Sequence, residues 1–239
     1  MRPDCSVDYR EHPPAPHLAG LIKAFWTLDA AGEAEQWIEQ RATPDGCVEI
    51  IRRLAGRSRW NGDQPETFMV GLIETPEPFA ISGDSRFAAV RLWPWTWSLF
   101  SDTPLDAARG CWLPFDGPIA RTLPDFPAVE ELLAGAPDRA EVGRAIVDAA
   151  RVGDMQATGM TARTLQRWFA RHVGMPPWRY LRLHRFQKAF EGVPGSQSLA
   201  GHAAEQGFAD QAHMARAFRE LAGVPARQAR KTAKGPFLT

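Results

Sequence analysis

The sequence predicts an α+β protein of two domains: a β-rich, barrel-like domain over residues 1–135 and an all-α domain with two helix-turn-helix motifs over residues 136–239. Three observations predict this division. Short apolar runs separated by Pro, Gly and Asp fill the first part, and apolar residues at helical spacing fill the last part. The two parts also carry opposite net charge, and one sequence phrase occurs twice in the helical part.

Short strands are expected in the first part of the chain, at residues 21–28, 36–41, 47–51, 67–71, 79–81 and 87–92. Strands this short, bounded by turn residues, are typical of a sandwich or a small barrel. Pro94 is placed to begin a short helix that runs through Trp97 to Phe100. The prolines between residues 104 and 127 predict a loop-rich middle.

Helical spacing begins at Val129 and resumes after Pro137, with the domain boundary near residue 135. A helix over residues 152–158 is expected before the first repeat, and a helix over 199–206, capped by Ser198, before the second. Between the repeats, residues 178–190 predict a longer helix that Gly192 ends. This connector is expected to hold two reading helices about one DNA turn, roughly 34 Å, apart.

The repeated phrase spans residues 159–169 and 207–218. Each copy has a glycine, Gly159 or Gly207, followed by a polar residue, Thr161 or Asp210, and an arginine-bearing amphipathic helix. Glycine permits a sharp turn with positive φ, and Thr and Asp are good N-caps. Two such helix-turn-helix signals predict a chain that reads duplex DNA.

In each repeat one helix face is apolar, with Leu165, Trp168 and Phe169 in the first and Met214 and Phe218 in the second. The opposite faces carry Arg and Gln, which match base edges in the major groove. The predicted DNA-contacting residues are Arg163, Gln166, Arg167, Arg171, Gln211, Ala212, Ala215 and Arg216. The alternative for Arg167 and Arg216 is pairing with nearby acids such as Glu205 or Glu220.

The net charge of zero conceals a strong asymmetry. Residues 151–239 carry 14 Lys and Arg against 5 Asp and Glu, a surplus of +9, whereas residues 1–150 carry 14 against 23, or −9. A basic module fused to an acidic domain is typical of a nucleic-acid-binding protein with a second function. The alternative is that both surfaces are ordinary solvated ones.

These residues resemble the AraC/XylS family of bacterial transcription regulators over about residues 138–230. The resemblance is carried by the Leu165–Phe169 block, the Gly174–Leu181 connector and the Gly207–Arg219 segment, which follow in family order. It implies a twin-motif domain whose two recognition helices enter successive major grooves. The helix before Gly159 is a residue shorter than the family pattern, Met155 stands at a small-residue position, and His202 stands at an aliphatic one.

The first part resembles, more loosely, the β-rich sensor domain found in one subgroup of these regulators. The matching residues are Trp26, the Pro44–Ile50 segment and the Val90–Pro94 segment, with Trp95 departing from the pattern. Seven of the nine Trp lie in the first 115 residues. They are interpreted either as core and interface packing or as an aromatic ligand pocket.

No cofactor, metal or catalytic site is expected. His12 and His17 lie near Cys5 without ligand-like spacing, and no nucleophile-elbow or phosphate-loop sequence occurs. The three widely spaced Cys predict no disulfide, and the sequence shows neither a signal region nor a membrane span, so a cytoplasmic protein is expected.

The function predicted is therefore sequence-specific transcription regulation, with double-stranded DNA as the main partner. A small-molecule effector, a second copy of the chain and RNA polymerase are the further partners considered. An alternative from another class is a cupin-like small-molecule-binding protein or enzyme whose helical domain serves assembly only; it would need metal-ligand clusters in the β-rich part.

Overall fold

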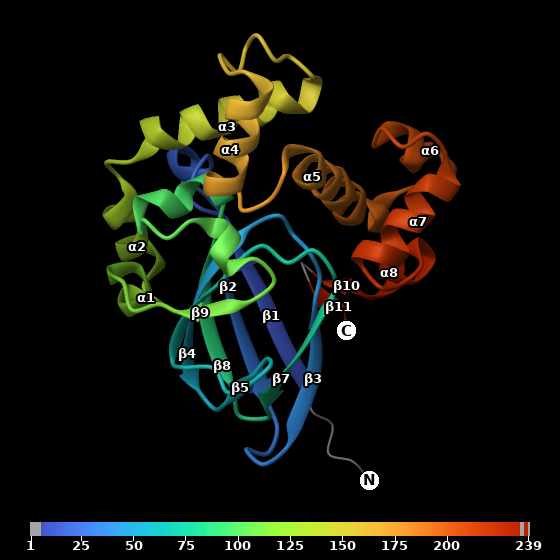
Figure 1. Ribbon diagram of the computed structural model, residues 1–239. Helices are drawn as coiled ribbons and strands as arrows, with labels where there is room; N and C mark the ends of the chain where they lie inside the picture. The colour runs from blue at the N-terminus through green and yellow to red at the C-terminus, as the bar shows by residue number, and fades with distance from the viewer. Residues whose placement is uncertain (1–5, 235–236, 239) are drawn as a thin grey trace.

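The computed structural model describes residues 6–234 and 237–238 of the chain. It consists of two β-sheets facing each other, with helices covering one end and one side of them (Figure 1). The β-rich first part and the helical second part predicted from the sequence are both confirmed. Cys5, considered above beside His12 and His17, lies outside the described residues.

The two sheets are built from antiparallel pairs. The six-stranded sheet has the order β1 (Ser6–His12), β2 (Ile22–Ala31), β8 (Arg86–Leu92), β4 (Val48–Ala55), β6 (Thr67–Val70) and β9 (Trp112–Pro114). The five-stranded sheet has the order β10 (Ala233–Lys234), β11 (Phe237–Leu238), β3 (Trp37–Ala42), β7 (Glu77–Ser82) and β5 (Ser58–Arg59). Within the described residues the sheets stay separate, so the barrel-like domain is a two-layer arrangement. The six predicted strands are present; β1, β5 and β9 in the first part of the chain and β10 and β11 near its end are additional.

The central strands of the larger sheet are buried on both faces. In β8, Phe87 and Ala89 belong to the apolar cluster between the two sheets, whereas Ala88, Val90 and Leu92 belong to the larger core shared with the helices. Successive strand residues point to opposite faces, which explains this alternation. Burial on both faces also explains the unbroken apolar run Phe87–Val90 within β8.

The helical elements lie mainly in the second half of the chain. They are η1 (Pro16–Leu18), η2 (Pro94–Leu99), η3 (Leu105–Ala108), α1 (Pro118–Thr122), α2 (Phe126–Leu133), α3 (Pro137–Val152), α4 (Ala162–His172), α5 (Pro177–Gly192), η4 (Val193–Gly195), α6 (Leu199–Glu205), α7 (Gln211–Leu221) and α8 (Ala226–Thr232). Pro94 begins η2, as predicted. The middle is less irregular than its prolines indicated, because Pro118 begins α1, where its missing N–H costs nothing.

The structure corrects one predicted helix. Residues 152–158 do not form a helix; α3 ends at Val152 because Gly153 adopts a left-handed conformation with φ 77°. The following residues form turns, in which the Asp154 carboxylate accepts a hydrogen bond from the Ala157 amide at 2.9 Å. The predicted all-α character extends to Thr232, after which β10 and β11 pair with each other and β11 pairs with β3.

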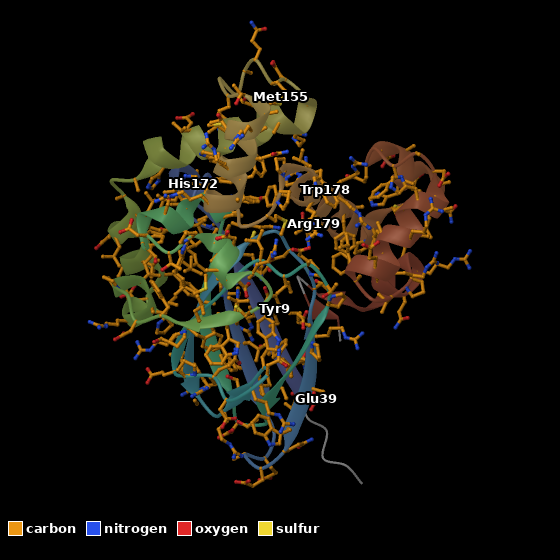
Figure 2. All side chains as sticks on the ribbon, in the orientation of Figure 1. Tyr9, Glu39, Met155, His172, Trp178 and Arg179 are labelled. Carbon is orange, nitrogen blue, oxygen red and sulfur yellow. The ribbon has the colours of Figure 1, made fainter. Side chains whose placement is uncertain are left out.

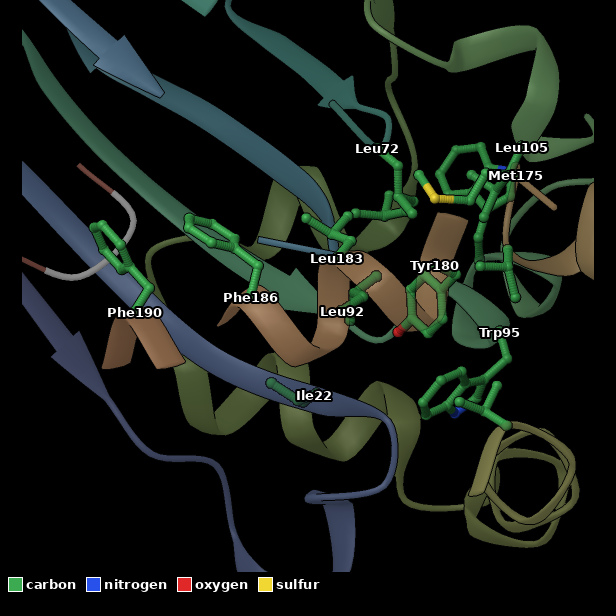
Figure 3. Close-up of a cluster of buried hydrophobic side chains, with 14 of the residues drawn as sticks. Ile22, Leu72, Leu92, Trp95, Leu105, Met175, Tyr180, Leu183, Phe186 and Phe190 are labelled. Carbon is green, nitrogen blue, oxygen red and sulfur yellow. The ribbon is translucent and has the colours of Figure 1, made fainter. Parts of the chain in front are cut away.

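One continuous apolar core joins the sheet and the helices. Figure 3 shows Tyr180, Leu183, Phe186 and Phe190 of α5 lying beside Ile22 of β2 and sheet and loop residues of the first part. α3 packs closely on η2 as well, because Gly143 lets the Trp95 ring approach it. None of the described helices combines the length and apolarity needed to cross a bilayer.

Candidate nucleic-acid interface

The first recognition helix is α4. It begins after Thr161, whose hydroxyl accepts a hydrogen bond from the Thr164 amide at 3.2 Å, so the predicted N-cap is confirmed. Gly159 has φ 63°, the left-handed conformation that the sharp turn requires. Leu165 and Phe169 are buried, which fixes one face of α4 against the core.

The opposite face of α4 is open to solvent. Arg163, Gln166, Arg167 and Arg171 are all exposed, so three guanidinium groups and one amide lie along one helix surface. The helix spacing places residues three and four apart side by side. This surface has the charge and hydrogen-bonding groups needed to contact DNA phosphates and base edges.

The second recognition helix, α7, is built in the same way. The Asp210 carboxylate accepts a hydrogen bond from the His213 amide at 2.6 Å, and Gly207 has φ 71°. Met214 and Phe218 are buried in the core, and Leu221 also faces it.

The outer face of α7 presents fewer polar groups than that of α4. Gln211, Ala212 and Arg216 are exposed, and Ala215 is half-buried. The two small residues leave room for close approach to the thymine methyl group, and Arg216 supplies the hydrogen-bond donors. Base contacts by these residues stay a prediction.

On the two reading faces, the arginines make no ion pair with any acidic side chain that the structure describes. Among the described residues, neither Arg167 nor Arg216 forms an ion pair. Glu220 instead pairs with Arg182 of α5, and Glu205 lies 4.0 Å from Nδ1 of His202. The alternative in which these two arginines serve only local ion pairing is therefore not what the structure shows.

The two recognition helices differ in what supports them. α7 packs against α6, α5 and α8, and α6 is capped by Ser198, whose hydroxyl accepts from the Gly201 amide at 3.0 Å. α4 packs against η2 and η3 of the first part of the chain, and turns stand where its supporting helix was expected. Met155, in those turns, is 39% exposed and lies at the edge of the molecule in Figure 2.

The connector between the motifs is α5, and it is docked on the β-rich part rather than free. The Gln187 side-chain amide donates to the Pro44 carbonyl. Lys23 of β2 pairs with Glu191 at 2.7 Å, and Arg179 pairs with Glu74 at the same distance. Figure 2 shows Arg179 beside the exposed Trp178 in the middle of the molecule. The connector is thus held from its first turn to its last.

A buried ionic cluster lies next to the turn at Pro44, whose carbonyl accepts the hydrogen bond from Gln187 of α5. Arg91, whose side chain is 3% exposed, contacts Glu49 at 2.9 Å, Asp45 at 2.8 Å and Glu11 at 2.7 Å. Burial acts to lower the pKa of Arg91, but Glu49 and then Asp45 raise it well above its usual value. Burial also raises the pKa of Glu49, against the effect of Arg91. Through Arg91, the cluster links β8 to β4, to β1 and to the turn at Asp45.

Sequence reasoning did not identify this cluster. Its signal was present in the strands, where Glu49 and Arg91 interrupt otherwise apolar runs. Charged residues at positions that alternate into a core need partners there. By contrast, the described residues contain no group of three His, Cys, Asp or Glu placed to hold a metal, which is what the cupin-like alternative requires.

Comparison with known proteins agrees with these observations. Residues 155–232 match the model of a helix-turn-helix domain, and residues 10–110 match that of a domain of unknown function, DUF6597. The chain carries an AraC-type helix-turn-helix domain. It is a DNA-binding protein of the transcription-regulator class.

Solved structures of similar chains span nearly its whole length. ToxT from Vibrio cholerae is 7% identical, with 92% of this chain and 96% of that chain covered and a TM-score of 0.46. ToxT with a bound unsaturated fatty acid is 9% identical, with 97% and 96% covered and a TM-score of 0.46. The AraC-like transcriptional activator CuxR is 12% identical, with 89% and 80% covered and a TM-score of 0.27. No curated protein sequence matches the chain.

Proposed function

We propose that this AraC-type regulator reads a bipartite DNA site, with α4 and α7 each inserted in a major groove of the same duplex. The observation that carries the proposal is the pair of capped helices of 11 residues, each with one apolar face buried and one face that exposes arginines without an ion pair to any described residue. An unpaired, exposed guanidinium needs no rearrangement before it contacts a guanine edge or a phosphate.

The two half-sites are proposed to contribute unequally. α4 offers Arg163, Gln166 and Arg167 to hydrogen-bond acceptors in the groove, whereas α7 offers Gln211 and Arg216 beside two alanines. Hydrogen-bonded discrimination between bases is therefore expected to be greater at the α4 half-site. The protein is proposed to act by binding, without catalysis, and RNA polymerase and a second copy of the chain remain proposed partners.

The N-terminal domain is proposed to modulate DNA binding through an effector. The support is mechanical: α3 and α4 pack on η2 and η3, and α5 is anchored to Pro44, Lys23 and Glu74 of the same domain. A ligand that favours one arrangement of the β-rich part would act on the placement of both recognition helices.

The decisive experiment is selection of bound genomic duplexes by the full chain, followed by anisotropy on the recovered site. Arg167→Ala and Arg216→Ala are each expected to weaken binding to that site by about 1–3 kcal/mol and to relax preference at one half-site. Binding to a scrambled duplex is expected to change far less. Arg86→Ala, an exposed arginine on β8, is the matched control and should leave both affinities unchanged.

Two results would contradict the proposal. Equal losses on specific and scrambled duplexes would reduce Arg167 and Arg216 to phosphate contacts. Affinity that does not fall with rising salt would contradict DNA binding by the basic part of the chain, because phosphate contacts by Lys and Arg release counterions.

A further inference from the structure

The supporting helix of the second motif contains a buried histidine. His202 of α6 is 4% exposed, at a position where the AraC/XylS pattern has an aliphatic residue. Its Nε2 lies 2.8 Å from the carbonyl oxygen of Ala189 in α5. Because a carbonyl only accepts hydrogen bonds, Nε2 carries the proton and donates it. A side chain of α6 is therefore bound to the backbone of the connector helix.

The acceptor belongs to the last turn of the connector. α5 ends at Gly192, so Ala189 supplies one of its last four carbonyl groups. These groups have no N–H partner within their own helix and are satisfied by donors from outside it. Val193, which follows the helix, has φ −63°, so no left-handed residue caps this end. The imidazole of His202 supplies a donor at this end of α5.

Gly192 leaves the space that the imidazole occupies. A Cβ at position 192 would lie 2.8 Å from Cε1 of His202, well inside the usual separation of two carbon atoms in contact. The backbone does not itself require glycine here, because Gly192 has φ −83°, which other residues adopt freely. The ring therefore accounts for the glycine, and the two residues form one unit.

The N-terminal domain holds the same turn of α5. Gln187 donates to a backbone carbonyl of that domain, and Glu191 pairs with Lys23 at 2.7 Å. These two residues lie two positions before and two positions after Ala189. On its other side, α6 packs against the recognition helix α7. His202 thus joins the second motif to a turn of the connector that the N-terminal domain also fixes.

We propose that His202 is a positioning residue for DNA binding: its hydrogen bond fixes the direction of α6, and with it α7, on the last turn of α5. Apolar contacts are non-directional, whereas a hydrogen bond is favourable only within a narrow range of distance and angle. The geometry between two recognition helices sets the spacing of half-sites that a protein accepts. The proposal rests on the proposed bipartite site, but the hydrogen bond is measurable without DNA.

The test compares two substitutions of the histidine. His202→Leu restores an aliphatic side chain and removes the donor, whereas His202→Gln keeps an N–H donor. Anisotropy measures the affinity of the full chain for the recovered site and for duplexes whose half-sites are one base pair closer or farther apart. One base pair changes the separation by about 3.4 Å and the rotation about the duplex axis by about 34°.

The unmodified chain is expected to prefer the native spacing. His202→Leu should lose up to about tenfold in affinity there, the value of one hydrogen bond, and much less at the altered spacings. His202→Gln is expected to retain most of the spacing preference. A spacing preference that His202→Leu keeps in full, or one that His202→Gln loses equally, would overturn the positioning role.

Gly192→Ala tests the unit from the other side. Its Cβ should displace the imidazole and weaken binding at the native spacing in the same way as His202→Leu. In a His202→Ala background, where the ring is absent, the same change should cause no further loss. Gly195→Ala, whose Cβ meets open space, is the matched control and should retain the affinity of the unmodified chain. Equal losses from Gly192→Ala in both backgrounds would contradict the pairing of glycine and ring.

Nitrogen-15 NMR of the histidine side chains tests the bond directly in the unmodified full chain. His202, identified by the loss of its signals in His202→Gln, is expected to carry its proton on Nε2. A neutral ring protonated on Nδ1 would overturn the proposal. A full chain that shows no preference for any spacing would instead overturn the proposed function, a result distinct from a preference that His202→Leu leaves unchanged.

Discussion

The two recognition helices are close copies of each other, yet they rest on different parts of the molecule. α4 and α7 each have 11 residues and an N-cap with a side-chain oxygen, and a left-handed glycine lies two residues before the cap of α4 and three residues before that of α7. Both helices pack on α5, but the remaining support of α7 comes from α6 and α8, whereas that of α4 comes from η2 and η3 of the N-terminal domain.

The difference shows that the repeated phrase specifies the reading helix but not its support. In the first copy Gly153 ends α3, and turns replace the supporting helix. In the second copy α6 is present, with Ala203 completely buried beside α7. The first motif is therefore completed by the N-terminal domain, and its position depends directly on that domain.

The largest expected effect comes from breaking the helix that the two motifs share. Leu181→Pro removes a backbone donor inside α5 and is expected to cost about 3 kcal/mol or more of stability and to abolish specific DNA binding. Leu181→Ala, which keeps the donor, should retain most of the affinity. Urea unfolding and anisotropy measure both. A folded proline variant with normal affinity would show that the motifs need no rigid connection.

A smaller change should affect the first motif alone. Gly143→Ala would place a Cβ 2.5 Å from Cγ of Trp95, where α3 meets η2. Alanine normally stabilises a helix relative to glycine, but here overpacking is expected to cost about 1–3 kcal/mol in urea unfolding. Gly135→Ala, where a Cβ meets open space, is the control. Sequence preference in DNA binding should fall at the half-site read by α4. An equal fall at both half-sites would contradict the view that the N-terminal domain supports α4 more directly than α7.

Acid is expected to lower the stability of the fold through His184 in α5. Burial first, and then the charge of Lys188 and Arg151, lower the pKa of His184 to about 4 from the usual 6.5. Lys23 acts in the same direction, and Asp148 opposes it. Folded His184 thus stays neutral while the unfolded residue takes up a proton. Stability from this group is present above pH 6.5 and is lost as the pH falls to about 4.

The loss attributable to His184 is expected to reach about 1–3 kcal/mol over that range. His184→Gln should flatten this part of the stability curve, measured by urea unfolding at a series of pH values. The exposed His17→Gln serves as the control and should leave the curve unchanged. A curve for His184→Gln as steep as that of the unmodified chain would show that this histidine carries no acid sensitivity.

The smallest effect is expected for Tyr180→Phe, which removes a buried hydroxyl where α5 packs on the N-terminal domain. Tyr180 is buried where α5 meets the N-terminal domain, and its hydroxyl has no partner among the described residues. Tyr180→Phe is expected to leave stability unchanged or to raise it by up to about 1 kcal/mol. The reciprocal change, Phe218→Tyr in the apolar cluster with Phe186 and Phe190, should cost about 1–3 kcal/mol. A marked loss in Tyr180→Phe would reveal a bound partner for that hydroxyl.

Much of the candidate interface was predictable because its signals are local. Helix caps at Thr161, Ser198 and Asp210 act within three residues, and the structure contains each of them. The exposed and buried faces of α4 and α7 follow from helical periodicity. Six strands of the N-terminal domain were predictable for the same reason. β1 was missed because its burial is slight and its sequence is polar, and β5 and β9 were missed because they have only two and three residues.

The sequence by itself determined the two-domain order, the strands and helices, the caps and the arginine faces, because these depend on residues within a few positions of one another. Only the tertiary structure decided that α4 rests on the N-terminal domain and that Glu49, Arg91 and Asp45 share one buried cluster. These features depend on contacts between residues far apart in the chain, where packing and charge pairing decide which local preferences survive.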